Sequence, residues 1–264
     1  MSITPPGTSE YPAMPLIVRN DGPHIVVVTI DNQAKRNAMT RDDLAELADL
    51  WPKLDQSPEC RAVVITGAGD KGFCAGADIG GDLSVAAETA AMVNRALLKT
   101  VPFTKPIIAA VNGDCAGGGV ELLLATDIRL AASHARFGLP EVRWSIYPFG
   151  GATVKLVQQI GYVHAMDLLL TGRLIDAATA ARLGLVNEVV AGPVLEAALA
   201  KARLVAANSP SAVQAVKEQV SRTIVEHALA REPLEQQLGD RVRAGPHFAE
   251  GLASFREKRA ARYE

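Results

Sequence analysis

The segment Pro106–Asp127, with the sequence PIIAAVNGDCAGGGVELLLATD, contains an apolar run, three consecutive glycines and a second apolar run. The first run ends in Asn-Gly and predicts a buried strand over 106–113. The second predicts a short helix that begins near Gly118 or Gly119. Backbone N–H groups at a helix start lack partners, and the helix dipole makes that end positive. The segment therefore predicts a strand–loop–helix unit that can stabilise a phosphate or an oxyanion formed during a reaction.

The rest of the chain repeats this alternation and predicts an α/β fold. Apolar runs predict buried strands over 24–30, 61–67 and 127–133, with one more candidate strand over 186–190. Helices are expected over 40–54, 83–99, 150–160, 163–171, 176–184, 193–207, 210–229 and 248–260. The first of these can be capped by Thr40 with Asp43 three positions on. An N-terminal α/β core thus passes into a helical C-terminal region.

Composition restricts the class of protein. The chain has 264 residues, a net charge of −2 and three widely spaced cysteines, so we expect neither nucleic acid nor a membrane as the main partner. The odd cysteine count without a C-x-x-C pair suits a reducing compartment, and we place the protein in the cytoplasm. Residues 1–15 carry no signal-peptide pattern and are expected to be a disordered leader.

Two familiar kinds of site are disfavoured. Gly67, Gly69 and Gly72 match the dinucleotide-binding pattern G-x-G-x-x-G, but the glycine-rich FCAGADIGGD follows where that site needs a helix. The histidines and cysteines lack metal-ligand spacing, so no metal is expected.

Two glutamates are candidate acid–base groups. Glu121 falls in the first turn of the predicted helix, where it is equally well explained as a capping acid. Glu141 follows Pro140 in a loop, where acids are usually just solvated. If the two carboxylates meet, their pKa values must separate, and one site then supplies both a base and an acid. The segment FCAGADI (73–79) is a second place where bare backbone can approach a ligand.

Several of these motifs, in the same order, resemble the enoyl-CoA hydratase/isomerase (crotonase) superfamily. The resemblance is carried by VTIDNQAKRNAM (28–39), VVITGAGDKGFCAGADI (63–79), KPIIAAVNGDCAGGGVELLLATDIRLAASHARFGLPE (105–141), LTGRLIDAATAARLGLVNEVV (170–190) and FAEGLASFREKR (248–259). It implies a crotonase-like spiral of repeated ββα units over 16–205 that holds the CoA and catalytic site. It also implies that the C-terminal helical region, 206–264, forms a homotrimer or a hexamer made of two trimers.

The resemblance also implies roles for individual residues. Backbone N–H groups of Ala77 and Gly118 would hold the thioester oxygen of an acyl-CoA, and Glu121 and Glu141 would act on water. A neighbouring subunit's last helix would add Phe255 and Lys258 to the site. The CoA contacts implied by motif position are Lys35, Arg36, Ala38, Ala75, Asp78 and Ile79.

These implications favour an enoyl-CoA hydratase of fatty-acid or related acyl-CoA breakdown, with no cofactor beyond the CoA of its substrate. One departure is Phe149, which stands where a glycine is expected beside the water and the acyl chain. An isomerase, or another lyase or hydrolase on the same scaffold, is therefore the alternative. A member that binds CoA or RNA without catalysis is the alternative from a different class.

Overall fold

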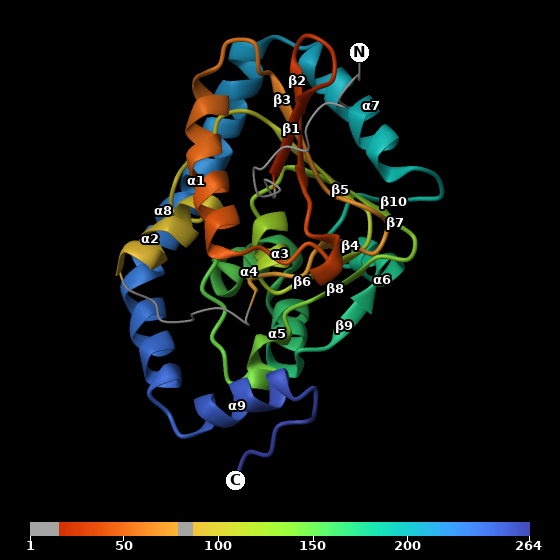
Figure 1. Cartoon of the computed structure of the whole chain (residues 1–264). Helices are drawn as coiled ribbons and strands as arrows, with labels where there is room; N and C mark the ends of the chain where they lie inside the picture. The colour runs from red at the N-terminus through yellow and green to blue at the C-terminus, as the bar shows by residue number, and fades with distance from the viewer. Residues whose placement is uncertain (1–15, 79–86) are drawn as a thin grey trace, which may run out of the picture.

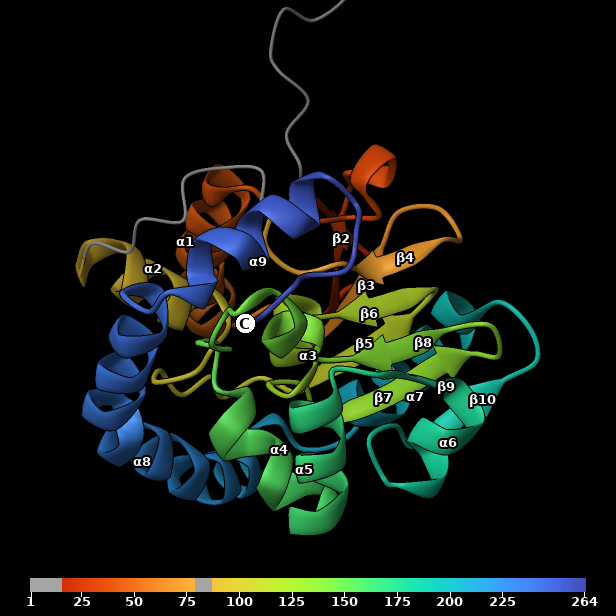
Figure 2. The ribbon, with the colours of Figure 1, turned by 90° about the horizontal axis from the view of Figure 1, so that it is seen from below.

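The computed structural model describes residues 16–78 and 87–264 (Figure 1). The expected leader 1–15, the expected CoA contact Ile79 and the first residues of the helix expected over 83–99 lie outside the described residues. In the described part, two sheets form the centre and helices surround them (Figure 2).

The larger sheet has six strands in the order β1-β2-β3-β5-β7-β10, and β1 is antiparallel to β2 while the other pairs are parallel. Its strands are β1 (Leu16–Asn20), β2 (Ile25–Ile30), β3 (Ala62–Gly67), β5 (Ile107–Val111), β7 (Ile128–Ala132) and β10 (Glu188–Val190). The five strands expected from the sequence are confirmed, and β1 is an addition at the edge.

The smaller sheet has the order β4-β6-β8-β9. Its strands are β4 (Gly72–Cys74), β6 (Asp114–Ala116), β8 (Arg136–Gly138) and β9 (Leu174–Asp176). The chain alternates between the sheets, because β4 follows β3, β6 follows β5 and β8 follows β7. Each step adds one strand to each sheet, which is the spiral that the resemblance implies. Cys74 pairs with Cys115 across β4 and β6.

The described helices are α1 (Arg41–Gln56), α2 (Ala87–Ala96), α3 (Gly118–Leu123), α4 (Ala152–Ile160), α5 (Tyr162–Thr171), α6 (Ala177–Arg182), α7 (Val194–Ala206), α8 (Pro210–Arg243) and α9 (His247–Arg256), with short 3-10 turns η1 (Gln33–Lys35) and η2 (Pro140–Trp144). One face of the larger sheet packs against α7, and the opposite face packs against α1. The expected capping box starts α1, where Thr40 and Asp43 exchange side-chain hydrogen bonds with each other's backbone N–H.

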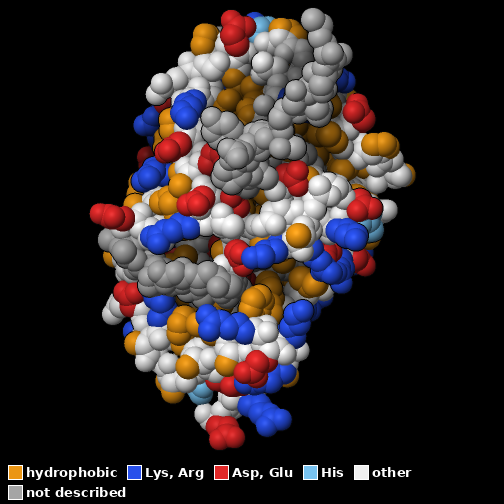
Figure 3. All heavy atoms as spheres, in the orientation of Figure 1, with side chains coloured by type: hydrophobic (Ala, Val, Ile, Leu, Met, Phe, Trp, Pro, Cys, Tyr) orange, Lys and Arg blue, Asp and Glu red, His pale blue; other side chains and the backbone are white. Residues whose placement is uncertain are grey.

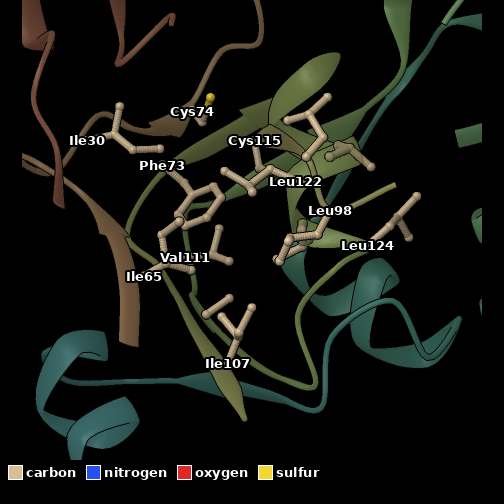
Figure 4. Close-up of a cluster of buried hydrophobic side chains, with 14 of the residues drawn as sticks. Ile30, Ile65, Phe73, Cys74, Leu98, Ile107, Val111, Cys115, Leu122 and Leu124 are labelled. Carbon is tan, nitrogen blue, oxygen red and sulfur yellow. The ribbon is translucent and has the colours of Figure 1, made fainter. Parts of the chain in front are cut away.

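Alternate residues of the strands enter two cores. Val64 and Ala110 face α7, whereas Ile65 and Val111 face α1 and α3. The second, larger core extends between the sheets and contains Phe73, Cys115 and Leu122 (Figure 4). Both loops that follow β4 and β6 are therefore anchored on a fully buried base.

The sequence-based boundary of one helix is wrong. A helix was expected over 210–229, but α8 continues through Pro233 to Arg243. Proline removes one backbone hydrogen bond and normally ends a helix. Here Glu235 and Gly239, beyond the proline, are buried against the rest of the chain, and this packing keeps the helix going. In Figure 1, α8 runs beside α2 and down toward α9.

No helix in the described ranges combines the length and the apolar character needed to cross a membrane.

Candidate active site

A cavity of about 390 Å³ lies where the loops after β4 and β6 meet η2, α2 and α8. Seven of the residues singled out in the sequence line it: Ala75, Ala77, Asp78, Gly118, Glu121, Glu141 and Phe149. Its lining is mostly apolar, as is usual for small-molecule sites. The spiral thus brings the loop after β4 and the loop after β6 to the same cavity, although about one repeat of the chain separates them.

Two backbone N–H groups border this cavity. Met39 pairs with the loop on either side of Ala77, because its N–H donates to the Gly76 carbonyl and its carbonyl accepts from Asp78. Gly118 is the first residue of α3. Within the described ranges, neither the Ala77 N–H nor the Gly118 N–H donates to another backbone group.

The two loops touch each other through Gly76. Its φ of 93° is in the left-handed region, and a Cβ there would lie 2.9 Å from the Gly118 nitrogen. A Cβ on Gly118 would in turn lie 3.5 Å from the Ala77 nitrogen. The two N–H groups are therefore close enough to serve one oxygen atom, the arrangement of an oxyanion hole.

Glu121 lies in the first turn of α3 and is 5% exposed. Its Oε1 accepts a hydrogen bond from the Ala152 N–H, 3.2 Å away, at the start of α4. Burial raises the pKa of Glu121 to about 7, although the Ala152 hydrogen bond and the charge of Lys99 act in the opposite direction. This carboxyl can therefore exchange a proton near neutral pH.

Glu141 lies in η2, directly after Pro140 at the end of the loop from β8. It is 9% exposed, and its Oε2 is buried without a hydrogen-bond partner in the described part of the chain. Burial and the nearby charge of Glu121 raise the pKa of Glu141 to about 8. An unpartnered buried carboxyl oxygen is costly, so this atom is suited to bind a water molecule or a substrate.

Phe149 stands where the resemblance implies a glycine, and a glycine follows it directly. Gly150, not Phe149, lies against the Glu121 carboxylate, so that any Cβ at position 150 would collide with Glu121 Oε2. Phe149 lines the cavity from the side of α8. Its ring lies 5.4 Å from the ring of Tyr147, beneath the Arg243 guanidinium, and fills the space left by Gly239.

Phe149 and Gly239 form a matched pair for a test of acyl-chain length. Phe149→Gly is expected to let longer acyl chains react, because it opens the cavity toward α8. Gly239→Ala is expected to favour shorter chains, because the new Cβ overlaps the Phe149 ring and pushes it inward. Turnover of a series of straight-chain 2-enoyl-CoAs checks both. Unchanged chain-length profiles in both variants would show that Phe149 does not bound the acyl pocket.

The two segments expected to grip CoA lie side by side. The Ala75 N–H donates to the Arg36 carbonyl, and Lys35 Nζ forms an ion pair with Asp78 Oδ2 at 2.6 Å. Ala38 is buried beneath them. Lys35, Arg36 and Ala38 lie outside the described lining of the main cavity, which Met39, Thr40 and Arg41 line instead.

The last helix, α9, packs against η2 of the same chain. Phe255 stacks edge-on against Trp144, with ring centroids 4.9 Å apart, and Trp144 lines the cavity. Lys258 is exposed just beyond α9. Phe255 therefore supports the cavity wall from behind. The expected contribution of Phe255 and Lys258 to a neighbouring subunit stays a prediction.

Sequence reasoning missed a charged group next to the site. Lys99 is 1% exposed and forms ion pairs with Glu232 and Glu235 of α8. Glu232 also lines the cavity. A signal was present, since Lys99 interrupts an apolar run and the two acids are three residues apart on one helix, but it does not identify the partners.

Among the described residues, no group of three or more His, Cys, Asp or Glu side chains is placed to hold a metal ion.

The site and the fold together define the class of protein: an α/β spiral in which two buried carboxyls face a pair of backbone N–H donors. Comparison with known proteins places the chain in a family. The family model described as enoyl-CoA hydratase/isomerase matches residues 21–264. The chain belongs to the enoyl-CoA hydratase/isomerase family, and at this level it is an enzyme of acyl-CoA metabolism.

Individual relatives agree along their whole length. The chain is 39% identical over 249 residues to enoyl-CoA hydratase EchA19 of Mycobacterium tuberculosis, covering 91% of this chain and 93% of the relative. It is 37% identical over 246 residues to mevalonyl-coenzyme A hydratase sidH of Aspergillus fumigatus, covering 90% of each. Among solved structures, carnitinyl-CoA hydratase from Mycobacterium avium superposes with a TM-score of 0.86 at 36% identity, covering 96% of this chain and 99% of that one.

Proposed function

We propose that the protein hydrates the double bond of a trans-2-enoyl-CoA. The observation that carries this proposal is the meeting of Glu121 and Glu141, both buried, in one cavity beside the N–H groups of Ala77 and Gly118. A single acid would suffice to move a proton in an isomerisation, whereas the addition of water needs a base for the water and an acid for the carbon. Relatives named as hydratases support the same choice.

In the proposed reaction, the thioester oxygen accepts hydrogen bonds from Ala77 and Gly118. These bonds draw electron density out of the conjugated double bond and stabilise the enolate-like transition state. The two carboxyls orient one water molecule, and Glu121 takes its proton while the oxygen bonds to the β-carbon. Glu141 gives a proton to the α-carbon. A proton transfer between the carboxyls, or with solvent, then restores the starting state.

This assignment follows the pKa values. Burial raises the pKa of both carboxyls, but the charge of Glu121 raises that of Glu141 further, whereas the hydrogen bond from Ala152 lowers that of Glu121, so Glu141 is the carboxyl that keeps its proton near neutral pH. Glu121 has the Ala152 N–H to stabilise its charge, whereas Glu141 Oε2 has no described partner.

Hydration is expected to be fastest between about pH 7 and about pH 8. Below this window Glu121 is protonated and cannot accept the proton of water, and above it Glu141 is ionised and cannot protonate carbon. Initial rates at saturating crotonyl-CoA, measured in buffers from acidic to alkaline, check this. A rate that stays constant on either side of the window would contradict the assignment.

The test of the function itself is a panel of enoyl-CoAs, followed by the loss of absorbance of the conjugated thioester and by identification of the products. A 3-hydroxyacyl-CoA supports hydration. Movement of the double bond, or release of free CoA, would favour the isomerase, lyase or hydrolase alternative. Because the relatives include a mevalonyl-CoA and a carnitinyl-CoA hydratase, branched, hydroxylated and cationic acyl groups belong in the panel.

A non-catalytic member that binds RNA is the rival from a different class. On the face shown in Figure 3, lysine and arginine side chains are interspersed with acidic ones, so this face carries no continuous basic surface. In addition, the buried Glu141 Oε2, which has no described hydrogen-bond partner, would serve no purpose in a protein that only binds an anionic ligand. Absence of turnover with every enoyl-CoA, together with RNA binding, would favour the rival.

We infer that the CoA portion lies along the paired segments 35–39 and 75–78. We also infer that the chain assembles into trimers or hexamers. Exposed apolar side chains on α8 support assembly, among them Val216 and Val220, which are 67% and 62% exposed. Sedimentation equilibrium distinguishes these states, and a monomer would contradict them. The cytoplasmic location remains a prediction.

A further inference from the structure

A buried polar network joins α8 to the acid–base site. Lys99 Nζ lies 2.9 Å from Glu235 Oε2 and 2.5 Å from Glu232 Oε2. Asn94, on α2, donates to Glu232 Oε1 at 2.7 Å. Glu235 Oε1 accepts a hydrogen bond from Thr153 Oγ1, also at 2.7 Å. Burial alone would lower the pKa of Lys99, but the hydrogen bonds to the two glutamates raise it.

The network ends next to Glu121. Thr153 directly follows Ala152, whose N–H donates to the Glu121 carboxylate. Both residues are in the first turn of α4. A shift of Thr153 therefore moves the N–H that fixes Glu121. Two hydrogen bonds, one to Thr153 and one from Ala152, thus link Glu235 to Glu121, although Glu235 lies 114 residues later in the chain.

Ionic contacts, more than apolar ones, fix α8 at this level. The helix has 34 residues, and Ala228, Glu235 and Gly239 are its buried ones. Pro233 lies between the two glutamates and removes one backbone hydrogen bond from the part of the helix that meets Lys99. The ion pairs of a buried lysine hold its two carboxylate partners firmly in place. If one partner is lost, charge is left uncompensated in a dry site, which is energetically costly.

We propose that Glu235 is a positioning residue for hydration. It holds Thr153 and Lys99 in fixed places, and thereby presents the Ala152 N–H to Glu121 and couples the C-terminal helix to the reaction. The proposal rests on the proposed function, since a base at Glu121 has meaning only if the chain moves protons. Glu235 itself lies outside the described lining of the cavity.

The network also sets the charge around Glu121. The groups that face it are Lys99 after α2, Lys155 on α4, Glu235 on α8, Glu141 in η2 and Tyr147 beyond it. The charge of Glu235 raises the pKa of Glu121 and that of Lys99 lowers it. Neutral glutamine at position 235 leaves Lys99 less compensated, so the pKa of Glu121 should fall.

The test compares Glu235→Gln and Thr153→Val with the wild-type chain. Both are expected to lower kcat for crotonyl-CoA hydration by roughly 10- to 100-fold, with little change in KM, because a small displacement of a reacting group costs rate more than binding. Glu235→Gln should also move the acidic limb of the pH–kcat profile to lower pH. Thr153→Ser, which keeps the hydroxyl, should restore kcat. Combining Glu235→Gln with Thr153→Val should be less than additive, because glutamine weakens and valine removes the same hydrogen bond.

The matched control is Glu226→Gln on the exposed face of α8, which should keep wild-type kcat and pH profile. Wild-type kcat and an unmoved acidic limb in both Glu235→Gln and Thr153→Val would overturn the proposal. So would equal losses in Thr153→Ser and Thr153→Val. If Glu235→Gln fails to fold, the Thr153 pair decides the question.

One measurement separates this proposal from the proposed function. Carbon-13 NMR of labelled glutamate carboxyls gives the pKa of Glu121 without any substrate, with Glu121→Gln identifying its signal. A lower pKa in Glu235→Gln supports the coupling even if the wild-type chain hydrates no enoyl-CoA. An unchanged pKa overturns the coupling even if hydration is found.

Discussion

Glu141→Gln is expected to lower kcat for enoyl-CoA hydration by about 10²–10⁴-fold, because it removes the group that protonates the α-carbon. Glutamine keeps the shape of the side chain but has no acidic proton to give. Glu121→Gln should cause a loss of the same order, since the water then lacks its base. Crotonyl-CoA turnover measured near pH 7.5, inside the window set by the two pKa values of about 7 and about 8, checks both variants.

Glu141→Gln should lower the activity without lowering the stability of the fold. The folded-state pKa of Glu141, about 8, lies above its ordinary value of 4.5, so the folded protein binds more protons than the unfolded chain between these values. Its contribution to stability is therefore present at low pH and is lost as pH rises toward 8. Glu141→Gln removes that loss and should raise Tm relative to the wild type at alkaline pH. Glu196→Gln, on the exposed side of α7, is the control. Near-native turnover in either site variant would remove that residue from the mechanism.

Gly118→Pro is expected to lower hydration by about 100- to 1,000-fold, the usual effect of removing one oxyanion donor. Proline lacks the N–H but is well suited to the first position of a helix, where Gly118 lies. Gly117, which precedes it, has φ 55° and ψ −127°, the mirror image of the extended conformation that normally precedes proline and one that glycine can adopt. The protein should therefore fold with its cavity intact.

Gly118→Ala separates the loss of the N–H from the loss of glycine. A Cβ at position 118 would lie 3.4 Å from Gly76 Cα, an ordinary contact, and the N–H stays in place. We expect this variant to keep most of its activity and its circular dichroism spectrum. Comparable activity in the proline and alanine variants would refute the oxyanion role of Gly118.

Much of the fold was predictable because long, buried strands carry a strong signal. The runs that became β2, β3, β5 and β7 are mostly apolar, as is expected of strands of a parallel sheet that is buried on both faces. The start of α3 at Gly118 was predicted because the apolar period changes there. The glycine pattern around Gly69 was correctly set aside, since β4 follows it rather than a helix.

The rest depended on tertiary contacts. The strands of the smaller sheet have three residues each, too few to show a period of two. The end of α8 was placed before Pro233 by local rules, but Glu235 and Lys99 hold the helix beyond it. The local sequence around Lys99 and Glu235 does not identify which distant residue each of them contacts.

Within the site, residue type was more predictable than position. Glu121 and Glu141 were singled out from their neighbours, and the structure brings both to one cavity. Gly150 lies against the Glu121 carboxylate, and this contact was not foreseen because it depends on how the turn from η2 into α4 folds back onto α3. Met39, Thr40 and Arg41 line the cavity, whereas the expected contact of Lys35–Ala38 with CoA stays a prediction.

The pairing of Cys74 with Cys115 accounts for the spacing of the two proposed oxyanion donors. Ala77 and Gly118 each come three residues after a member of this pair, so they occupy equivalent places in successive coils of the chain. Neighbouring strands are about 4.8 Å apart, and two nitrogens at that separation can each reach one oxygen at about 2.9 Å, with an angle of roughly 110° at the oxygen. The pitch of the coil, rather than any side chain, thus sets this distance. Substitutions in the acyl pocket or at the two acids can therefore change the reaction, while the backbone still offers the same two hydrogen bonds to a thioester oxygen.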